Sequence, residues 1–314
     1  MSFAFTYPGQ GSQAVGMGRT LYDGYPEARA VFDAVDDALG ETLSTLIFEG
    51  PEEDLRLTAN AQPALMAVSL AAQAALTAEG VAVERASVVA GHSLGEYSAL
   101  AAAGALSVGD AARLLRLRGR AMQEAVPAGM GAMAALLGLD LADAQAVAAE
   151  AAQGEVCEVA NDNAPGQCVV SGDRAAVERA VEIAKEKGAR RAVLLPVSAP
   201  FHCALMAPAA EAMKAALADA AMSAPAVPLI ANVSLEALTE PGALKASLVA
   251  QVTGRVRWRE TVAGFASRGI THQLEIGAGK VLCGLTKRID KGLTATPINT
   301  AEDVRAFAER QAAA

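Results

Sequence analysis

The segment Ala86–Ala103 constrains the fold of this chain most strongly, because it contains the pentapeptide Gly91-His92-Ser93-Leu94-Gly95. A short apolar run, Val88–Ala90, leads directly into the pentapeptide, and an alanine-rich helical pattern follows it. G-x-S-x-G between a strand and a helix is typical of a nucleophile elbow, a sharp turn that lifts a serine hydroxyl above a sheet. Such a turn leaves no room for Cβ atoms beside the serine, which accounts for both glycines. We therefore expect an α/β fold with Ser93 as a nucleophile.

The same pentapeptide also arises by chance in glycine-rich proteins, and this chain of 314 residues contains 28 glycines. The strand before Ser93 and the helix after it favour the catalytic interpretation. The first turn of that helix carries free N–H groups and the positive end of the helix dipole, which favour developing negative charge. A tetrahedral oxyanion is therefore expected to be stabilised beside Ser93.

Composition indicates a soluble globular protein with a large core. Hydrophobic residues make up 53% of the chain and aromatic residues only 4%, so the core must consist mainly of Ala, Val and Leu. No apolar run is expected to reach the length of a membrane span, and the amino end lacks the basic and apolar regions of a signal peptide. The sequence therefore predicts a cytoplasmic protein without a membrane partner.

Charge and cysteine spacing narrow the choice of partners. The net charge is −9 and no dense basic run occurs, which argues against nucleic acid as a partner. The four cysteines are scattered without C-x-x-C spacing, so we expect reduced thiols and neither a zinc site nor a disulfide framework.

The first strand and the loop after it form a second candidate segment. Phe3–Tyr7 is a short β-prone run that ends at Pro8-Gly9-Gln10-Gly11-Ser12-Gln13. Glycines on both sides of Gln10 allow the backbone to pass close to another segment and leave the Gln10 N–H free to point into a site. An ordinary β-turn explains the same string equally well.

A later helix, expected from Ser107 to about Val126, is rich in arginine. Helical spacing places Arg113, Arg116 and Arg120 on one face, and Arg118 on roughly the opposite side from Arg116. A cation on the apolar face is costly to bury without a partner. Arg118 is therefore expected either to meet a buried partner or to reach the surface along its aliphatic stem.

Residues 128–198 have an internal order of their own. They read as strand, helix, strand, strand, helix and strand, with a hairpin loop over Asn161–Gly166. This βαββαβ order is that of ferredoxin-like folds. We therefore predict an α/β-hydrolase-like catalytic domain with a parallel-sheet core, formed by residues 1–127 and 199–314, and a ferredoxin-like domain inserted at 128–198.

Only three histidines are available as a general base. His92 is adjacent to Ser93 and should point away from it around the elbow, and His272 begins an expected strand, where a structural role is favoured. His202 lies in a loop beside a proline and just before a helix, which suits a residue presented into a cleft. His202 is therefore the preferred base.

No aspartate stands out as a third triad member. The α/β-hydrolase order is Ser, acid, His, yet the acids between Ser93 and His202 lie mostly on expected helices or in the inserted unit. Another acceptor is therefore expected to orient the imidazole. Gly277-Ala278-Gly279-Lys280 lacks the spacing of a phosphate loop and is not interpreted as one.

Six motifs now occur in a recognisable order: PGQGSQ, GHSLGEYSAL, RGRAM, NDNAPGQCVVSG, PFHCALM and EIGAGKVLCGLTKRI. Each motif is weak alone, but together they span essentially the whole chain. In this order the chain resembles the malonyl-CoA:acyl carrier protein transacylases of fatty acid synthesis.

The resemblance implies a role for each matching residue. Ser93 matches the acylated nucleophile and His202 the general acid–base. Gln10 and Leu94 match the positions whose backbone N–H groups form the oxyanion hole, and Arg118 matches the arginine that binds the malonyl carboxylate.

Two further matches concern orientation and selectivity. Gln251 matches the residue whose main-chain carbonyl orients the histidine, which would explain the missing aspartate. Phe201 resembles the bulky residue that crowds an α-methyl branch in malonyl-selective acyltransferases, although bacterial relatives often have serine before this histidine.

The implied activity is ping-pong transfer of a malonyl group from malonyl-CoA to the phosphopantetheine thiol of holo acyl carrier protein. No tightly bound cofactor or metal is implied, and a monomer is expected. Alternatives are a serine esterase or thioesterase, a malonyltransferase of polyketide synthesis, and a non-catalytic module that binds the carrier protein.

Overall fold

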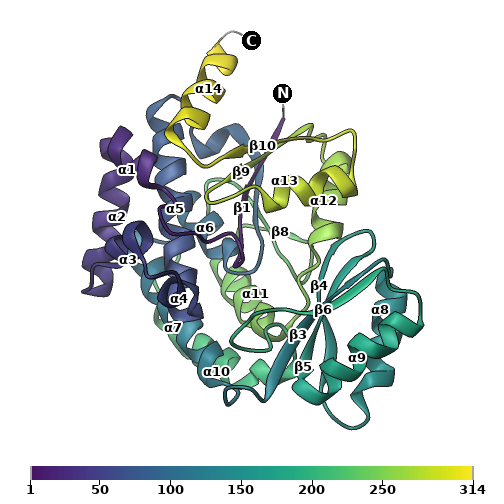
Figure 1. The fold of residues 1–314 in the computed structure, drawn as a ribbon. Coiled ribbons are helices and arrows are strands. Elements are labelled where there is room, and N and C mark those ends of the chain that lie inside the picture. Colours follow the sequence, from purple (N-terminus) through teal and green to yellow (C-terminus); the bar gives the residue numbers. More distant parts are fainter. Residues whose placement is uncertain (1, 313–314) are drawn as a thin grey trace.

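A six-stranded sheet lies at the centre of the computed structural model, which describes residues 2–312. The strand order is β10-β9-β1-β2-β7-β8 (Figure 1). Neighbouring strands from β10 to β7 run parallel, whereas β7 and β8 pair antiparallel. The strands are Phe3–Tyr7 (β1), Ala86–Gly91 (β2), Leu229–Ile230 (β7), Ala237–Leu238 (β8), His272–Ile276 (β9) and Thr294–Ile298 (β10).

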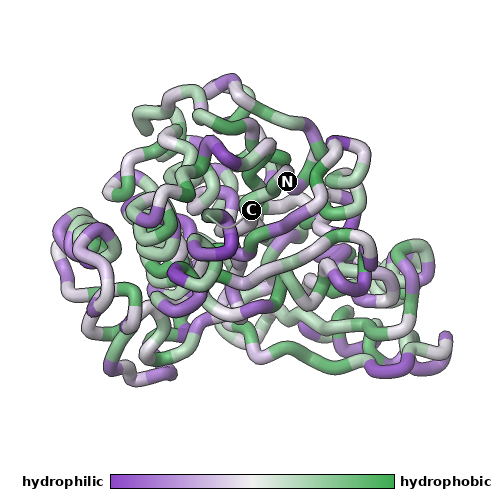
Figure 2. Tube along the Cα trace, turned by 90° about the horizontal axis from the view of Figure 1, so that it is seen from above, coloured by the Kyte–Doolittle hydropathy of each residue, from purple (hydrophilic) through white to green (hydrophobic). Residues whose placement is uncertain are grey.

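Helices cover both faces of this sheet, so its central strands are buried on both sides. Phe5 and Val89 contribute to one core cluster, while Ala4 and Val88 contribute to another that includes Trp258. The outer helices carry hydrophilic and hydrophobic residues side by side, as expected of amphipathic helices (Figure 2). The helices are α1 (Arg19–Gly24), α2 (Pro26–Leu39), α3 (Leu43–Glu49), α4 (Glu52–Arg56), α5 (Thr58–Ala78), α6 (Gly95–Ala102), α7 (Val108–Glu124), α10 (Ala207–Asp219), α11 (Pro241–Thr253), α12 (Trp258–Ser267), α13 (Val281–Ile289) and α14 (Ala301–Ala312), with short 3₁₀ turns at Val83–Arg85 and Ala204–Met206.

Helix α5 corrects one sequence-based expectation. This helix of 21 residues is long and apolar enough to cross a membrane, judged by length and composition alone. However, 83% of the apolar window is buried within the fold, where α5 packs against α2 and α7. The apolar run therefore forms a core helix, and it is longer than the sequence analysis allowed.

A second sheet of four antiparallel strands lies beside the first, in the order β4-β5-β3-β6. Helices α8 and α9 cover one face of it (Figure 1) and enclose a separate hydrophobic core. The elements follow one another in the predicted βαββαβ order. They are β3 (Gly131–Leu137), α8 (Leu141–Ala152), β4 (Cys157–Ala164), β5 (Gln167–Asp173), α9 (Arg174–Glu186) and β6 (Arg191–Leu194).

The turn between β4 and β5 is shorter than expected. The predicted loop over Asn161–Gly166 is wrong, because β4 continues to Ala164 and only Pro165 and Gly166 form the turn. Strand β7 of the six-stranded sheet is short as well, with only Leu229 and Ile230.

The extension of β4 has a physical reason in the neighbouring main chain. Val256 donates its N–H to Ala160 O at 2.8 Å and accepts from Asp162 N at 3.0 Å. The Asp162 carboxylate, only 1% exposed, also forms an ion pair with Arg259 of α12 at 2.7 Å. The end of β4 is therefore held against Val256 and α12, and it continues as a strand instead of forming a loop.

Candidate active site

The elbow between β2 and α6 depends on close backbone contacts. A Cβ atom at Gly91 would lie 1.9 Å from the carbonyl carbon of Gly95, and one at Gly95 would lie 2.3 Å from Tyr7 O. Both glycines are therefore required by contact, as the sequence indicated. Ser93 itself has a φ of 54°, a left-handed conformation that is costly for a residue with a side chain. The fold holds Ser93 in a strained turn that presents its hydroxyl.

The loop after β1 lies directly against this elbow. A Cβ atom at Gly9 would lie 2.7 Å from His92 O, and Gly11 has a φ of 108°. The two glycines thus bring Gln10 close to the elbow, while the Gln10 side chain donates to Thr58 Oγ1 at 3.2 Å. The string is more than an ordinary turn, because it forms one wall of the pocket that contains Ser93.

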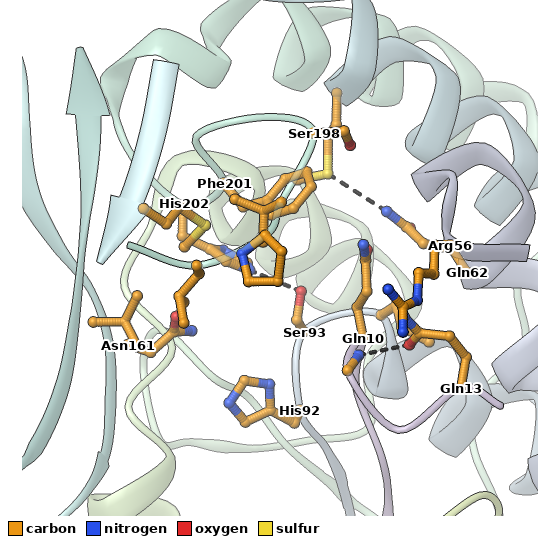
Figure 3. A pocket seen from close by; sticks show the side chains of 18 of the residues that line it. Gln10, Gln13, Arg56, Gln62, His92, Ser93, Asn161, Ser198, Phe201 and His202 are labelled. Atoms are coloured by element: carbon orange, nitrogen blue, oxygen red, sulfur yellow. Dashed lines mark hydrogen bonds between the residues drawn. The ribbon is translucent and has the colours of Figure 1, made fainter. Parts of the chain in front are cut away.

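His202 faces Ser93 across this pocket (Figure 3), with 2.7 Å between His202 Nε2 and Ser93 Oγ. His202 Nδ1 lies 2.9 Å from Gln251 O and 3.1 Å from Gly254 O. Carbonyl oxygens accept only, so these partners place the imidazole proton on Nδ1 and leave Nε2 as an acceptor for the serine proton. Two main-chain carbonyls occupy the position that an aspartate would take in a triad.

The environment of His202 favours the neutral imidazole. The side chain is buried, and it is held by a backbone with a φ of 58°. Burial and the positive charge of Arg118 lower the pKa of His202 to about 3. The imidazole is therefore neutral at physiological pH, as a general base must be.

Arg118 lies on α7 with only 1% of its surface exposed. It donates through Nη2 to Ser93 Oγ at 3.1 Å and through Nη1 to Gln62 Oε1 at 2.8 Å. Among the described residues its Nε–H has no hydrogen-bond partner. Burial lowers the pKa of Arg118, but a guanidinium stays protonated in proteins, so the site holds a cation beside the nucleophile.

The helical spacing separated Arg118 correctly from its neighbours. Arg113 and Arg120 are exposed and Arg116 is half-buried, whereas Arg118 points into the core. Gly119 allows this approach, because a Cβ atom there would lie 2.5 Å from Thr58 O of α5. Arg118 was expected either to meet a buried partner or to reach the surface, and in the structure it meets buried partners.

Sequence reasoning missed three polar residues of the site, and each is buried. Gln62 comes from α5, Glu96 from the first turn of α6, and Asn232 from the segment after β7. Asn232 joins both sides of the elbow: its Nδ2 donates to Gly91 O at 2.7 Å and its Oδ1 accepts from Ser93 N at 2.9 Å. A polar residue within an alanine-rich or apolar run was the available signal for each.

Glu96 lies under the elbow and accepts two hydrogen bonds. Asn232 N donates to Glu96 Oε1 at 2.6 Å, and Gln251 Nε2 donates to Glu96 Oε2 at 2.5 Å. Burial raises the pKa of the Glu96 carboxyl to about 8, while these hydrogen bonds and the charge of Arg118 act in the opposite direction.

These groups surround a pocket of about 410 Å³. Its lining includes the predicted residues Gln10, Ser93, Leu94, Arg118, Phe201 and His202, whereas Gln251 lies behind the lining and reaches it through Arg118 and His202. A cavity of this size admits a small acyl group together with part of a longer arm.

The other two histidines have different partners. His92 Nε2 lies 2.8 Å from Asn163 Oδ1, and the ring is 5.7 Å from that of Trp258. It lies away from the Ser93–His202 pair, as expected (Figure 3). His272 begins β9 and packs near Phe3, with 5.6 Å between the ring centroids.

Within residues 2–312, no group of three or more His, Cys, Asp or Glu side chains is arranged to hold a metal ion. All four cysteines are free and buried. The side chains that meet beside Ser93 are those of His202 and Arg118, an imidazole and a guanidinium.

Known proteins resemble this chain over its full length. A curated relative, the malonyl CoA-acyl carrier protein transacylase of Bacillus subtilis, is 46% identical over 302 residues, which covers 96% of this chain and 94% of the relative. The corresponding transacylase of Escherichia coli is 46% identical over 297 residues, covering 95% of this chain and 96% of the relative.

Solved structures are similar to the same extent. An acyl-carrier-protein S-malonyltransferase from Bartonella henselae is 56% identical, with a TM-score of 0.97 over 99% of this chain and 100% of that one. A malonyl-transacylase in complex with a type II PKS acyl-carrier protein is 42% identical, with a TM-score of 0.96 over 99% of this chain and 100% of that one. The protein-family model of the acyl transferase domain matches residues 4–302 of this chain. The chain therefore belongs to the acyl transferase family, among its malonyl CoA-acyl carrier protein transacylases.

Proposed function

We propose that this protein transfers a malonyl group from malonyl-CoA to the phosphopantetheine thiol of an acyl carrier protein, through a malonyl ester on Ser93. The observation that carries the proposal is the position of Arg118. Its buried guanidinium lies 3.1 Å from Ser93 Oγ, and its Nε–H has no partner within residues 2–312. A carboxylate on the acyl group is the chemistry that such a cation recognises.

In the first half-reaction, His202 Nε2 accepts the proton of Ser93 as Oγ attacks the thioester carbonyl carbon. The backbone N–H groups of Gln10 and Leu94, on the two sides of Ser93, stabilise the oxyanion. When the C–S bond breaks, the coenzyme A thiolate takes the proton from His202, and malonyl-Ser93 remains.

In the second half-reaction, the carrier-protein thiol gives its proton to His202 and attacks the malonyl ester. The C–O bond to Ser93 breaks, and the imidazolium returns the proton to Ser93 Oγ. The carbonyls of Gln251 and Gly254 hold the imidazole in one tautomer during both transfers. No tightly bound cofactor takes part in either step.

Selectivity for malonate over acetate follows from burial. An acetyl group leaves the Arg118 cation without a carboxylate partner, and a desolvated charge without a partner is penalised. Phe201, 9% exposed and beside His202, is proposed to crowd an α-methyl branch.

The domain division predicted above is part of the proposal. Residues 1–127 and 199–314 would form an α/β-hydrolase-like domain, and 128–198 a ferredoxin-like insertion, which the strand order β4-β5-β3-β6 and the separate core support. We propose a cytoplasmic enzyme in fatty acid synthesis that acts as a monomer, since nucleophile, base and arginine come from one chain.

The test is a product assay with malonyl-CoA in the presence and absence of holo acyl carrier protein. A transferase yields malonyl-carrier protein and little free malonate. Rapid release of malonate without an acceptor would indicate a thioesterase, and no reaction of either kind would indicate a binding module. A carrier protein from fatty acid synthesis and one from polyketide synthesis, compared as acceptors, distinguish the two pathways.

A further inference from the structure

Glu96 is a buried acid that the reaction above does not use. It has no exposed surface, and it lies in the first turn of the helix that follows the nucleophile. Both carboxylate oxygens accept hydrogen bonds, at 2.6 Å from Asn232 N and at 2.5 Å from Gln251 Nε2. A proton on either oxygen would face an N–H donor, so this geometry requires the ionised carboxylate even though burial raises its pKa, and Glu96 acts as an acceptor at both oxygens.

The Gln251 side chain connects Glu96 to the arginine. Its Oε1 accepts from Arg118 Nη2 at 2.8 Å, and its Nε2 donates both to Glu96 Oε2 and to Ser93 O, the latter at 2.9 Å. The Gln251 side chain, like that of Glu96, has no exposed surface. One amide thus lies between a cation and a carboxylate that do not touch each other.

The chemistry of the neighbours allows only one orientation of this amide. An arginine has donors and no acceptor, so it requires the amide oxygen. The Ser93 carbonyl and Glu96 require the amide nitrogen on the other side. Reversing the amide would place donor against donor and acceptor against acceptor, which is costly for buried groups.

We propose that Glu96 is a positioning residue that fixes the Gln251 amide, and through it the guanidinium of Arg118, in the orientation that receives the acyl carboxylate. The inference rests on the proposed function, because it assigns Glu96 to the recognition of the malonyl group. Glu96 touches neither the substrate nor the reacting atoms.

Glu96→Gln breaks this arrangement with little change of shape. Asn232 N still needs an acceptor, so the new amide places its oxygen there and its NH₂ group against Gln251 Nε2. The two donors repel each other, and the amide that holds Arg118 is displaced. An acetyl group has no carboxylate for Arg118 to bind, so the rate of acetyl transfer should fall less than the rate of malonyl transfer.

The experiment measures Ser93 acylation by malonyl-CoA and by acetyl-CoA, with KM and kcat determined separately. Glu275→Gln is the matched control. Glu275, on β9, is equally buried, and its two carboxylate oxygens accept hydrogen bonds from the backbone N–H groups of Leu282 and Cys283 in α13. We expect Glu96→Gln to raise the KM for malonyl-CoA. The ratio of kcat/KM for malonyl-CoA to kcat/KM for acetyl-CoA, here called the malonyl-to-acetyl ratio, should fall about tenfold. Glu275→Gln should leave this ratio unchanged.

The outcomes separate this inference from the proposed function. If the wild-type protein forms no malonyl-Ser93, the proposed function fails. If it forms the ester but Glu96→Gln has the same malonyl-to-acetyl ratio as Glu275→Gln, Glu96 is merely structural and the inference is overturned. If Glu96→Gln does not fold, Gln251→Met provides the second test. This variant removes the side-chain amide but keeps the main-chain carbonyl that contacts His202. A malonyl-to-acetyl ratio equal to that of the wild-type protein would then contradict the inference.

Discussion

The pocket has two walls that are built in different ways. The elbow wall is formed by the turn between β2 and α6, with the loop after β1 packed against it, and is held by close backbone contacts such as Gly91 against Gly95. The opposite wall brings Arg118, His202 and Gln251 together from three distant segments by side-chain hydrogen bonds. The first wall depends on close packing of glycines, and the second on a buried polar network.

The difference predicts how each wall fails. A backbone contact has no room to adapt, so an added atom on the elbow wall should cost folding stability as well as activity. The hydrogen-bonded wall should instead lose selectivity or rate while the fold remains.

The largest effect is expected from Gly91→Ala, whose Cβ atom would lie 1.9 Å from the Gly95 carbonyl carbon. The elbow must open, so acylation of Ser93 should be lost and the melting temperature should fall by about 10 °C. Gly284→Ala is the control, since nothing lies within 4 Å of its added Cβ on α13. Alanine there should stabilise the helix by about 1 kcal/mol. Equal melting temperatures for the two variants would contradict the account of the elbow.

Arg118→Ala tests the opposite wall. Removing the buried cation should lower kcat/KM for malonyl-CoA about 100-fold and leave acetyl transfer far less affected, because only malonate carries the carboxylate. Arg113→Ala on the same helix is the control, because Arg113 is exposed and pairs with Asp110. Equal losses for the two acyl groups would refute the role of Arg118.

A smaller effect is expected in the pH profile, because the pKa of His202 is lowered to about 3. The acylation rate at pH 5.5 should stay close to its value at pH 7.5, whereas an ordinary imidazole would cause a fall of about tenfold. An acid limb near pH 6.5 in single-turnover kinetics would show that the imidazole titrates normally.

The same shift affects stability. The folded-state pKa lies below that of the unfolded chain, so the unfolded state binds more protons between about pH 3 and pH 6.5. The contribution of His202 to the free energy of unfolding therefore decreases as the pH falls through this range. Denaturant titrations of the wild-type protein and of His202→Gln at several pH values measure this contribution, and the free energy of unfolding is expected to decrease less steeply with falling pH in the variant.

The elbow wall was accessible from the sequence because its determinants are local. Gly91, Ser93 and Gly95 lie within five residues of one another. The βαββαβ order was accessible for the same reason, since it depends on periodicity and turn residues.

On the opposite wall, helical spacing singled out Arg118 and loop position singled out His202, but the hydrogen bonds that join this wall could not be worked out in this way. The role of Gln251 rested on family resemblance alone, and Glu96, Gln62 and Asn232 were missed because their partners lie far away in sequence. The loop expected at Asn161–Gly166 failed for a related reason: pairing with Val256 overrode the local turn preference.

The most direct test of the central claim is the intact mass of the wild-type protein and of Ser93→Ala after incubation with malonyl-CoA and no acceptor. The account predicts that the wild-type protein gains one malonyl group, that the group is removed by holo acyl carrier protein, and that Ser93→Ala gains nothing. A stable gain that persists in Ser93→Ala, or no gain in the wild-type protein, would contradict the account.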